Sequence, residues 1–145
     1  MLASLTRWSW RWGPVVLVMA LIFVASGTPG RDLPSFGAWN LLAMKGGHMT
    51  GYALLAASCL RGLVRTRSVS RRLVILALVL TGCYAVTDEF HQSFTPGRTP
   101  SVVDVGIDIA GGATGAGIWM LVRRVRRQFQ SPDLGAPQAD DGENR

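Results

Sequence analysis

Cysteine is scarce in this chain, and its placement excludes several kinds of site. The 145 residues include only Cys59 and Cys83, and neither belongs to a CxxC or Cys/His pattern. A structural zinc site or a disulfide scaffold needs more cysteines at shorter spacings, so neither class fits. Each cysteine lies inside an apolar stretch, and the sequence therefore predicts two buried free thiols.

The chain also lacks the features of a nucleic-acid-binding protein. Its net charge is +6, but the arginines lie in short clusters beside apolar blocks and do not follow one helical face. No internal repeat is present, and the length allows one domain without a separate soluble module. No nucleic-acid partner is expected, and the lipid bilayer is the expected environment.

The apolar residues, 48% of the chain, are grouped in four blocks. Because a hydrocarbon core about 30 Å thick needs about 20 helical residues, the blocks predict an all-α, polytopic membrane protein. A cleaved signal peptide is the alternative interpretation of the first block. We predict a transmembrane domain at residues 1–127 with four transmembrane helices and a disordered cytoplasmic tail at 128–145; the helices are expected at about 10–27, 41–64, 72–93 and 101–122.

Three arginine clusters predict the orientation of these helices. They flank the first block, fill the connection between the second and third blocks, and follow the fourth block. The positive-inside rule places such clusters in the cytoplasm. Four spans with both N and C termini cytoplasmic satisfy all three clusters, and residues 88–101 then face outward.

Ionisable residues are concentrated between the third and fourth blocks. Asp88, Glu89, His91 and Gln92 end the third predicted helix, while Asp104 and Asp108 follow in the fourth. From a helix start near Ser101, the last two lie roughly 5 and 10 Å deep. An ionisable group at membrane depth is a functional-site hypothesis by default.

Two further elements bring polar side chains to the same depth. On the second predicted helix, Lys45, His48 and Tyr52 share one face because they are spaced by three and four residues. A Pro96-Gly97 turn directs Arg98 back toward the carboxylates, with which a guanidinium can pair. We therefore predict one outward-facing polar site with ten candidate binding residues: Lys45, His48, Tyr52, Asp88, Glu89, His91, Gln92, Arg98, Asp104 and Asp108.

The chemistry of this cluster stays open at the level of sequence. Its histidines and carboxylates supply enough ligands for a divalent metal, although no local motif such as HExxH is present and nothing in the sequence requires a cofactor. Glu89, His48 and Asp104 are candidates for acid–base catalysis. The alternative is a charge-paired polar plug that fixes helix packing, with Arg98 as the partner of Asp88, Glu89 or Asp104.

Glycine pairs offer close helix contacts. Gly47-xxx-Gly51 and Gly111-xxx-Gly115 fit the small-xxx-small pattern that lets membrane helices approach closely. The pattern leaves open whether these faces pack inside the chain or form a homo-oligomer.

With these residues laid out, the chain resembles the VanZ-like family of small bacterial integral membrane proteins, named for an association with resistance to the glycopeptide teicoplanin. The resemblance covers about residues 41–122 and departs from the family at two positions. Met44 stands where an acid is common, and Asp108 where Asn is frequent. The matching residues are Lys45, His48, Tyr52, Asp88, Glu89, Gln92, Phe94, Pro96, Gly97, Arg98, Ser101, Asp104, Asp108 and the glycines that follow.

The resemblance implies a multi-pass protein of the bacterial plasma membrane whose polar site lies on the extracytoplasmic face. The implied function is to bind or modulate a cell-envelope ligand, such as a lipid headgroup, a cell-wall precursor or a glycopeptide-related molecule, and to contribute to teicoplanin-type resistance. The alternative is a membrane-embedded enzyme that acts on a lipid-linked or cell-wall substrate by carboxylate/His acid–base or metal chemistry.

Overall fold

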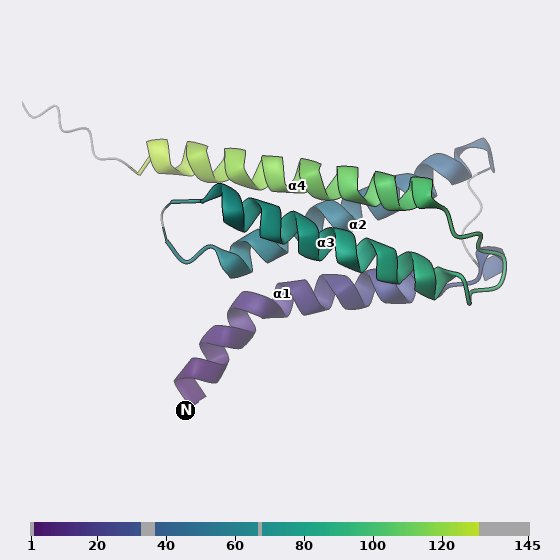
Figure 1. The fold of residues 1–145 in the computed structure, drawn as a ribbon, viewed down its shortest axis with the longest axis horizontal. Coiled ribbons are helices and arrows are strands. Elements are labelled where there is room, and N and C mark those ends of the chain that lie inside the picture. Colours follow the sequence, from purple (N-terminus) through teal and green to yellow (C-terminus); the bar gives the residue numbers. More distant parts are fainter. Residues whose placement is uncertain (1, 33–36, 67, 131–145) are drawn as a thin grey trace, which may run out of the picture.

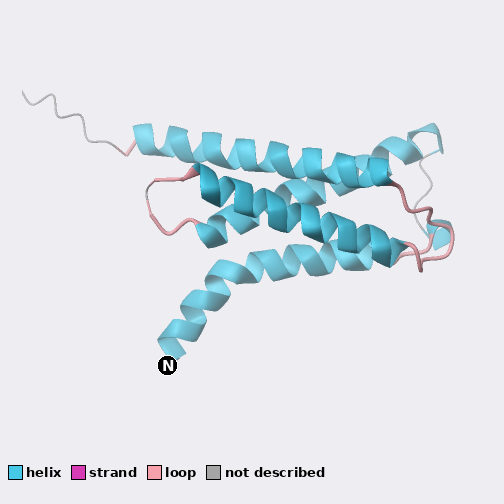
Figure 2. Cartoon of the chain, viewed as in Figure 1, coloured by secondary structure: helices cyan, strands magenta, loops and turns pink. Residues whose placement is uncertain are grey.

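The computed structural model describes residues 2–32, 37–66 and 68–130, which form four long helices (Figure 1). Two short 3-10 helices, Gly30–Asp32 and Gly37–Trp39, lie between the first two. No strand occurs in the described residues (Figure 2). The prediction of an all-α protein with four helices is confirmed; the helices are α1 Leu2–Ser26, α2 Asn40–Leu63, α3 Arg71–Gln92 and α4 Val102–Gln128.

Two helices are longer than the sequence predicted. α1 begins at Leu2 rather than near residue 10, and α4 continues to Gln128 rather than ending near residue 122. Arg, Leu, Ala and Gln are all good helix formers, so nothing in these basic flanks stops a helix once it has started. Residues 131–145, most of the predicted tail, lie outside the described residues.

Pro14 bends α1, as Figure 1 shows for its N-terminal part. Proline has no N–H to donate to the carbonyl four residues earlier, and its ring displaces that carbonyl. The carbonyl in question belongs to Trp10, and it accepts a hydrogen bond from Arg61 of α2 at 2.8 Å. Arg11 donates in the other direction to the carbonyl of Gly62 at 2.7 Å. The bend is thus tied to the end of α2 by two arginines.

The helices run up and down, and α2 lies at the centre of the packing. The α1–α2 and α3–α4 connections meet at one end of the bundle, and the α2–α3 connection lies at the other end with the C-terminus of α4 (Figure 1). α2 contacts α1, α3 and, most extensively, α4. Residues from the ends of all four helices therefore converge at the end where α4 begins.

Three of the four helices are long and apolar enough to cross a membrane, namely Thr6–Ser26, Arg71–Gln92 and Val102–Gln128. The sequence predicted four transmembrane helices. α2 has 24 residues and is not too short, but its first half carries Lys45, His48 and other polar groups. α2 makes the most extensive contacts with other helices, so it needs less apolar surface toward lipid than its neighbours do.

Large apolar side chains cover the outside of the bundle. Leu17, Leu21 and Val24 of α1, among many others, are more than half exposed. An exposed apolar surface of this extent is typical of helices that face lipid. Cys59 is buried as predicted, but the prediction that Cys83 is buried is wrong: it lies on the exposed side of α3, and both thiols are free.

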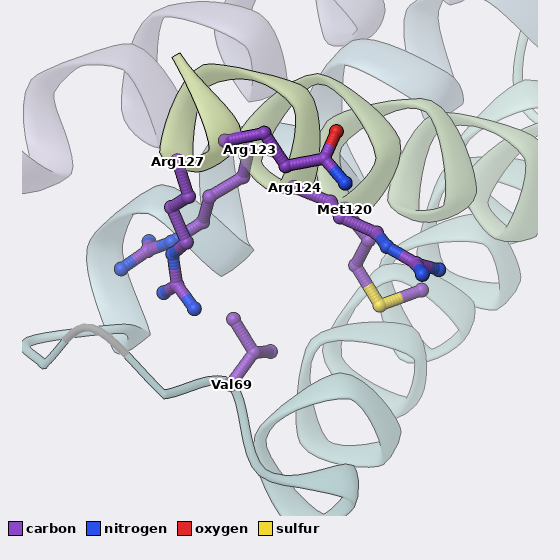
Figure 3. Close-up of a pocket in the computed structure, with 6 residues that line it drawn as sticks. Val69, Met120, Arg123, Arg124 and Arg127 are labelled. Atoms are coloured by element: carbon purple, nitrogen blue, oxygen red, sulfur yellow. The ribbon is translucent and has the colours of Figure 1, made fainter. Parts of the chain in front are cut away.

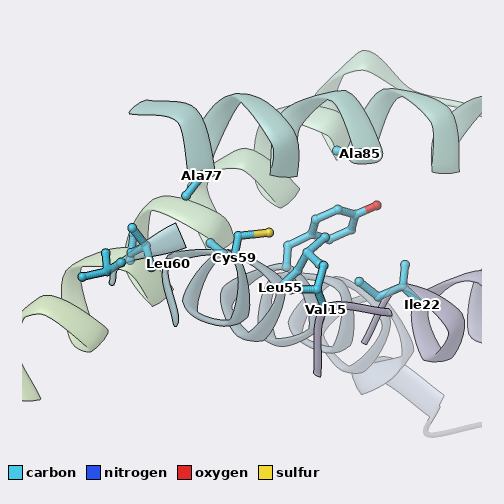
Figure 4. Packing of buried hydrophobic residues seen from close by; sticks show 11 residues of the cluster. Val15, Ile22, Leu55, Cys59, Leu60, Ala77 and Ala85 are labelled. Atoms are coloured by element: carbon cyan, nitrogen blue, oxygen red, sulfur yellow. The ribbon is translucent and has the colours of Figure 1, made fainter. Parts of the chain in front are cut away.

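The buried core fills the space between α2 and its neighbours (Figure 4). It is completed by a close contact of α2 with two glycines of α4. A Cβ atom at Gly111 would lie 2.5 Å from the carbonyl oxygen of Met49, and one at Gly115 would overlap the backbone of Ala53. The Gly111-xxx-Gly115 motif therefore packs against α2 inside the chain, and this face of α4 is not free to contact a second copy of the protein. The buried core residues are Val15, Ile22, Tyr52, Leu55, Ala56, Cys59, Leu60, Val64, Ala77, Ala85 and Ala116.

Candidate functional site

The close α2–α4 contact aligns an ion pair and a His–carboxylate pair near the start of α4. Lys45 forms an ion pair with Asp104, and both side chains are about one-third exposed. One turn deeper, Nδ1 of His48 lies 3.5 Å from Oδ1 of Asp108. The spacings of three residues on α2 and four on α4 bring each basic residue opposite one carboxylate.

Asp108 is the deepest carboxylate of this pair of helices. Its side chain is 1% exposed, and neither oxygen accepts a hydrogen bond from a described residue. The 3.5 Å to His48 is longer than a well-formed hydrogen bond. Tyr52 of α2 is fully buried beside Asp88 of α3. A buried carboxylate is costly unless a partner satisfies it, so Asp108 marks a place where a ligand could bind.

A second carboxylate, Asp88 of α3, is bound by α1 and by its own helix. The Ser26 hydroxyl donates to Oδ2 of Asp88 at 2.8 Å, and the Gln92 amide donates to the same oxygen at 3.1 Å. Asp88 is 2% exposed. This carboxylate thus joins the ends of α1 and α3.

Glu89 fixes the start of α4. Its Oε1 accepts a hydrogen bond from the backbone N–H of Ser101 at 2.5 Å. Ser101, near which the sequence predicted the helix to start, is the N-cap of α4, and its hydroxyl accepts from the N–H of Val103 at 3.2 Å. A carboxylate beside a helix N-terminus is favoured by the helix dipole. Oε1 of Glu89 therefore positions the start of α4, while its Oε2 has no described partner.

The α3–α4 connection contains the predicted turn, but the partner of Arg98 differs from the predicted one. Gly97 has φ +78°, and the N–H of Arg98 donates to the carbonyl of Thr95 at 3.1 Å. The Arg98 guanidinium donates to the carbonyl of Ala25 at 3.3 Å and forms no ion pair with a described carboxylate. The expected pairing with Asp88, Glu89 or Asp104 is therefore wrong. The C-terminal carbonyls of α1 reach the guanidinium instead.

His91 faces α1. Its ring stacks on Phe23 of α1, with ring centroids 4.0 Å apart, and its Nε2 lies against Gly27. Residues two apart on a helix do not share a face, so Glu89 and His91 point to different sides of α3. His91 belongs to the α1–α3 contact.

A cavity of about 120 Å³, which we call the polar cavity, brings most of the predicted site together. Its wall is contributed by α2, the end of α3, the α3–α4 turn and α4. Six of the ten predicted residues line it, together with Met44 and Ile107: Lys45, His48, Gln92, Arg98, Asp104 and Asp108.

The side chains proposed as metal ligands are not gathered. Within residues 2–32, 37–66 and 68–130, no three His, Cys, Asp or Glu side chains meet in an arrangement that could hold a metal ion. His48 lies in the polar cavity, whereas His91 lies against α1. What the polar cavity offers is a mixed set of carboxylate acceptors, guanidinium and ammonium donors and an imidazole.

Sequence reasoning missed two residues that hold this end of the bundle. Ser26 binds Asp88, and the hydroxyl of Tyr84 donates to the carbonyl of Met19 at 2.7 Å. The only signal for Ser26 was a hydroxyl at the end of an apolar block, one residue before the predicted end of the first helix. In the bundle it is fully buried.

An apolar helical bundle whose described carboxylates and histidines gather at one end is an integral membrane protein with a polar site. The sequence model of the VanZ/LLP1 family matches residues 11–123, more than three quarters of the chain, and the chain therefore belongs to that family. The resemblance stated from the sequence is confirmed. Comparisons with curated proteins and with solved structures give no significant match.

Proposed function

We propose that this protein binds a small polar group of a cell-envelope molecule in the polar cavity, on the extracytoplasmic face of the bacterial plasma membrane. The observation that supports this most is the convergence of six predicted site residues on one cavity. Separate elements supply them: α2, the end of α3, the α3–α4 turn and α4.

The side chains favour a ligand that both donates hydrogen bonds and carries an anionic or acceptor group. Both oxygens of Asp108 accept no hydrogen bond from the described residues, and a ligand ammonium, amide or hydroxyl could donate to them. Arg98 has a buried Nε without a described partner and can donate to a phosphate or carboxylate. Lys45 is already neutralised by Asp104.

The size of the cavity limits which part of a ligand it can hold. Its volume is about 120 Å³, whereas sites for drug-sized molecules are roughly 300–1,000 Å³. A headgroup or one end of a cell-wall precursor fits, and a whole glycopeptide does not. A contribution to teicoplanin-type resistance would therefore act through an envelope component.

The proposed topology has α2 as a fourth span and both termini in the cytoplasm. The arginines of the α2–α3 connection and of the end of α4 lie at the end of the bundle opposite the polar cavity (Figure 1). The positive-inside rule assigns that end to the cytoplasm.

Cysteine labelling tests this topology. In a chain with Cys59→Ala and Cys83→Ser, we expect Thr99→Cys to react with a membrane-impermeant maleimide in intact cells. Arg126→Cys, at the opposite end, should react only after the membrane is opened. Equal labelling of both positions in intact cells would contradict the proposed orientation.

Loss of Arg98 is expected to weaken ligand binding about tenfold or more, the effect of one charge-assisted hydrogen bond. We would compare Arg98→Gln with Arg31→Gln, since Arg31 lies in the exposed α1–α2 connection at the same end and outside the cavity. Teicoplanin susceptibility at matched membrane levels is the readout. Arg98→Gln should remove any protection given by the wild type, and Arg31→Gln should keep it.

A second pair of variants tests the carboxylate. Asp108→Asn has nearly the same shape and should insert normally, and Asp32→Asn removes an exposed carboxylate from the same end of the bundle. Reduced protection from Asp108→Asn alone would support a donor-bearing ligand at Asp108. Equal protection from wild type, Arg98→Gln and Asp108→Asn would show that the cluster serves helix packing only.

A further inference from the structure

We propose that a second cavity, at the end of the bundle opposite the polar cavity, binds the phosphate of an anionic lipid headgroup. This arginine cavity is lined by Arg123, Arg124, Arg127, Met120 and Gln128 of α4 and by Val69 of the α2–α3 connection (Figure 3). Its volume is about 420 Å³. It shares no residue with the polar cavity, so this proposal does not depend on the function proposed above.

The length of α4 places the arginine cavity at headgroup depth. α4 has 27 residues, which at 1.5 Å per residue is about 40 Å, against a hydrocarbon core of about 30 Å. If Ser101 marks one boundary, the other is reached near residue 121. The final turns, which carry the arginines, then lie among the phosphates of that leaflet.

The helical spacing in these final turns gathers the arginines on one side. Positions 120, 123, 124 and 127 are separated by three, one and three residues and share one face of α4. Figure 3 shows the labelled side chains of this face around the space beside Val69. Arg126 lies in the same charge cluster but does not line the cavity. The structure thus separates three cavity arginines from a fourth of equal charge.

Arg123 is held in place by the protein. Arg123 donates to the carbonyl of Thr66 at 2.5 Å, and its guanidinium lies 5.0 Å from the ring centroid of Trp119. These contacts attach the α2–α3 connection, which supplies Val69 to the lining, to α4. Its position is therefore fixed before any ligand binds, which reduces the entropy lost on binding.

The chemistry of the lining selects an anion. None of the described residues that line the cavity carries a carboxylate, while three carry a guanidinium. Guanidinium groups bind phosphate through paired hydrogen bonds and are over-represented at such sites. Met120 and Val69 add an apolar wall, which suits the glycerol and first acyl carbons of a lipid better than a free phosphate ion.

Lipid binding to the purified full-length chain in a neutral detergent tests the proposal. Native mass spectrometry would be recorded during titration with phosphatidylglycerol, with phosphatidylcholine and with inorganic phosphate. We expect wild type to bind phosphatidylglycerol in preference to phosphatidylcholine. The Arg124→Gln/Arg127→Gln variant should bind it about tenfold or more weakly, because two phosphate contacts are lost. Arg123 is left intact because it also holds the α2–α3 connection.

Arg126→Gln is the matched control, since it removes one charge from the same helix outside the cavity. It should bind phosphatidylglycerol as wild type does, and all variants should unfold at similar temperatures without lipid. A loss as large in Arg126→Gln as in the double variant would overturn the proposal in favour of diffuse attraction. Displacement of phosphatidylglycerol by an equal concentration of inorganic phosphate would also overturn it, because the site would then take a soluble phosphate.

Discussion

Replacing Gly115 with valine is expected to lower the free energy of unfolding by about 3 kcal/mol or more, at the upper end of overpacking effects. A Cβ atom at this position would overlap the backbone of Ala53 in α2. A backbone segment inside a helix cannot rotate away as a flexible side chain can. α2 and α4 must therefore move apart. The residues of the two pairs between these helices, Lys45–Asp104 and His48–Asp108, would then no longer lie opposite each other.

Gly117→Val is the control for this substitution. It makes the same chemical change two residues further along α4, where a Cβ atom would meet nothing within 4 Å. Thermal unfolding in detergent should show a much lower transition temperature for Gly115→Val and a small change for Gly117→Val. Similar transition temperatures for the two variants would mean that the close α2–α4 contact is not required for stability.

The polar cavity was predictable because its residues depend on local spacing. Lys45 and His48 share one face of α2, and Asp104 and Asp108 share one face of α4, whatever the neighbouring helices are. The same rule would have separated Glu89 from His91, which are two residues apart, had it been applied along α3. Glu89 and His91 lie at a similar depth, but depth does not determine which side of a helix a residue occupies.

Contacts of the α1 C-terminus were not predictable in this way. Arg98 donates to the carbonyl of Ala25, and Ser26 donates to Asp88. Both contacts join segments more than 60 residues apart, and both depend on where α1 ends beside α3. An apolar block shows that a helix exists, but it does not show which carbonyls and hydroxyls its last turn presents.

The C-terminal end of α4 was not predicted correctly, for a different reason. The hydrophobic pattern stops near Val122, but the end of an apolar pattern marks a membrane boundary and not a helix boundary. Arginine is as good a helix former as most apolar residues, so the helix continues to Gln128. The continuation matters for the proposed lipid site, because it puts Arg123, Arg124 and Arg127 on one face of α4, where they line the arginine cavity.

The contact between Ser26 and Asp88 is expected to be one of the strongest single interactions in the bundle. Asp88→Ala would leave the Ser26 hydroxyl and the Gln92 amide without their acceptor in a buried place. At roughly 1–3 kcal/mol for each unsatisfied group, the loss of stability should be about 3 kcal/mol or more. Ser26→Ala alone should cost about 1.5 kcal/mol, as one hydrogen bond to a charged group is lost.

A double-mutant cycle separates this contact from general disruption. If the hydroxyl acts through the carboxylate, Ser26→Ala should cost almost nothing in the Asp88→Ala background, which gives a coupling free energy of about 1 kcal/mol or more. Thr87→Ala is the control, since its exposed hydroxyl bonds only to the carbonyl of Tyr84 in the same helix. Additive effects of Ser26→Ala and Asp88→Ala in thermal unfolding would show that the two residues stabilise the bundle independently. The bond of Asp88 to Gln92, within α3, would then be the one that stabilises the bundle, and Arg98 and Tyr84 would position the end of α1 instead.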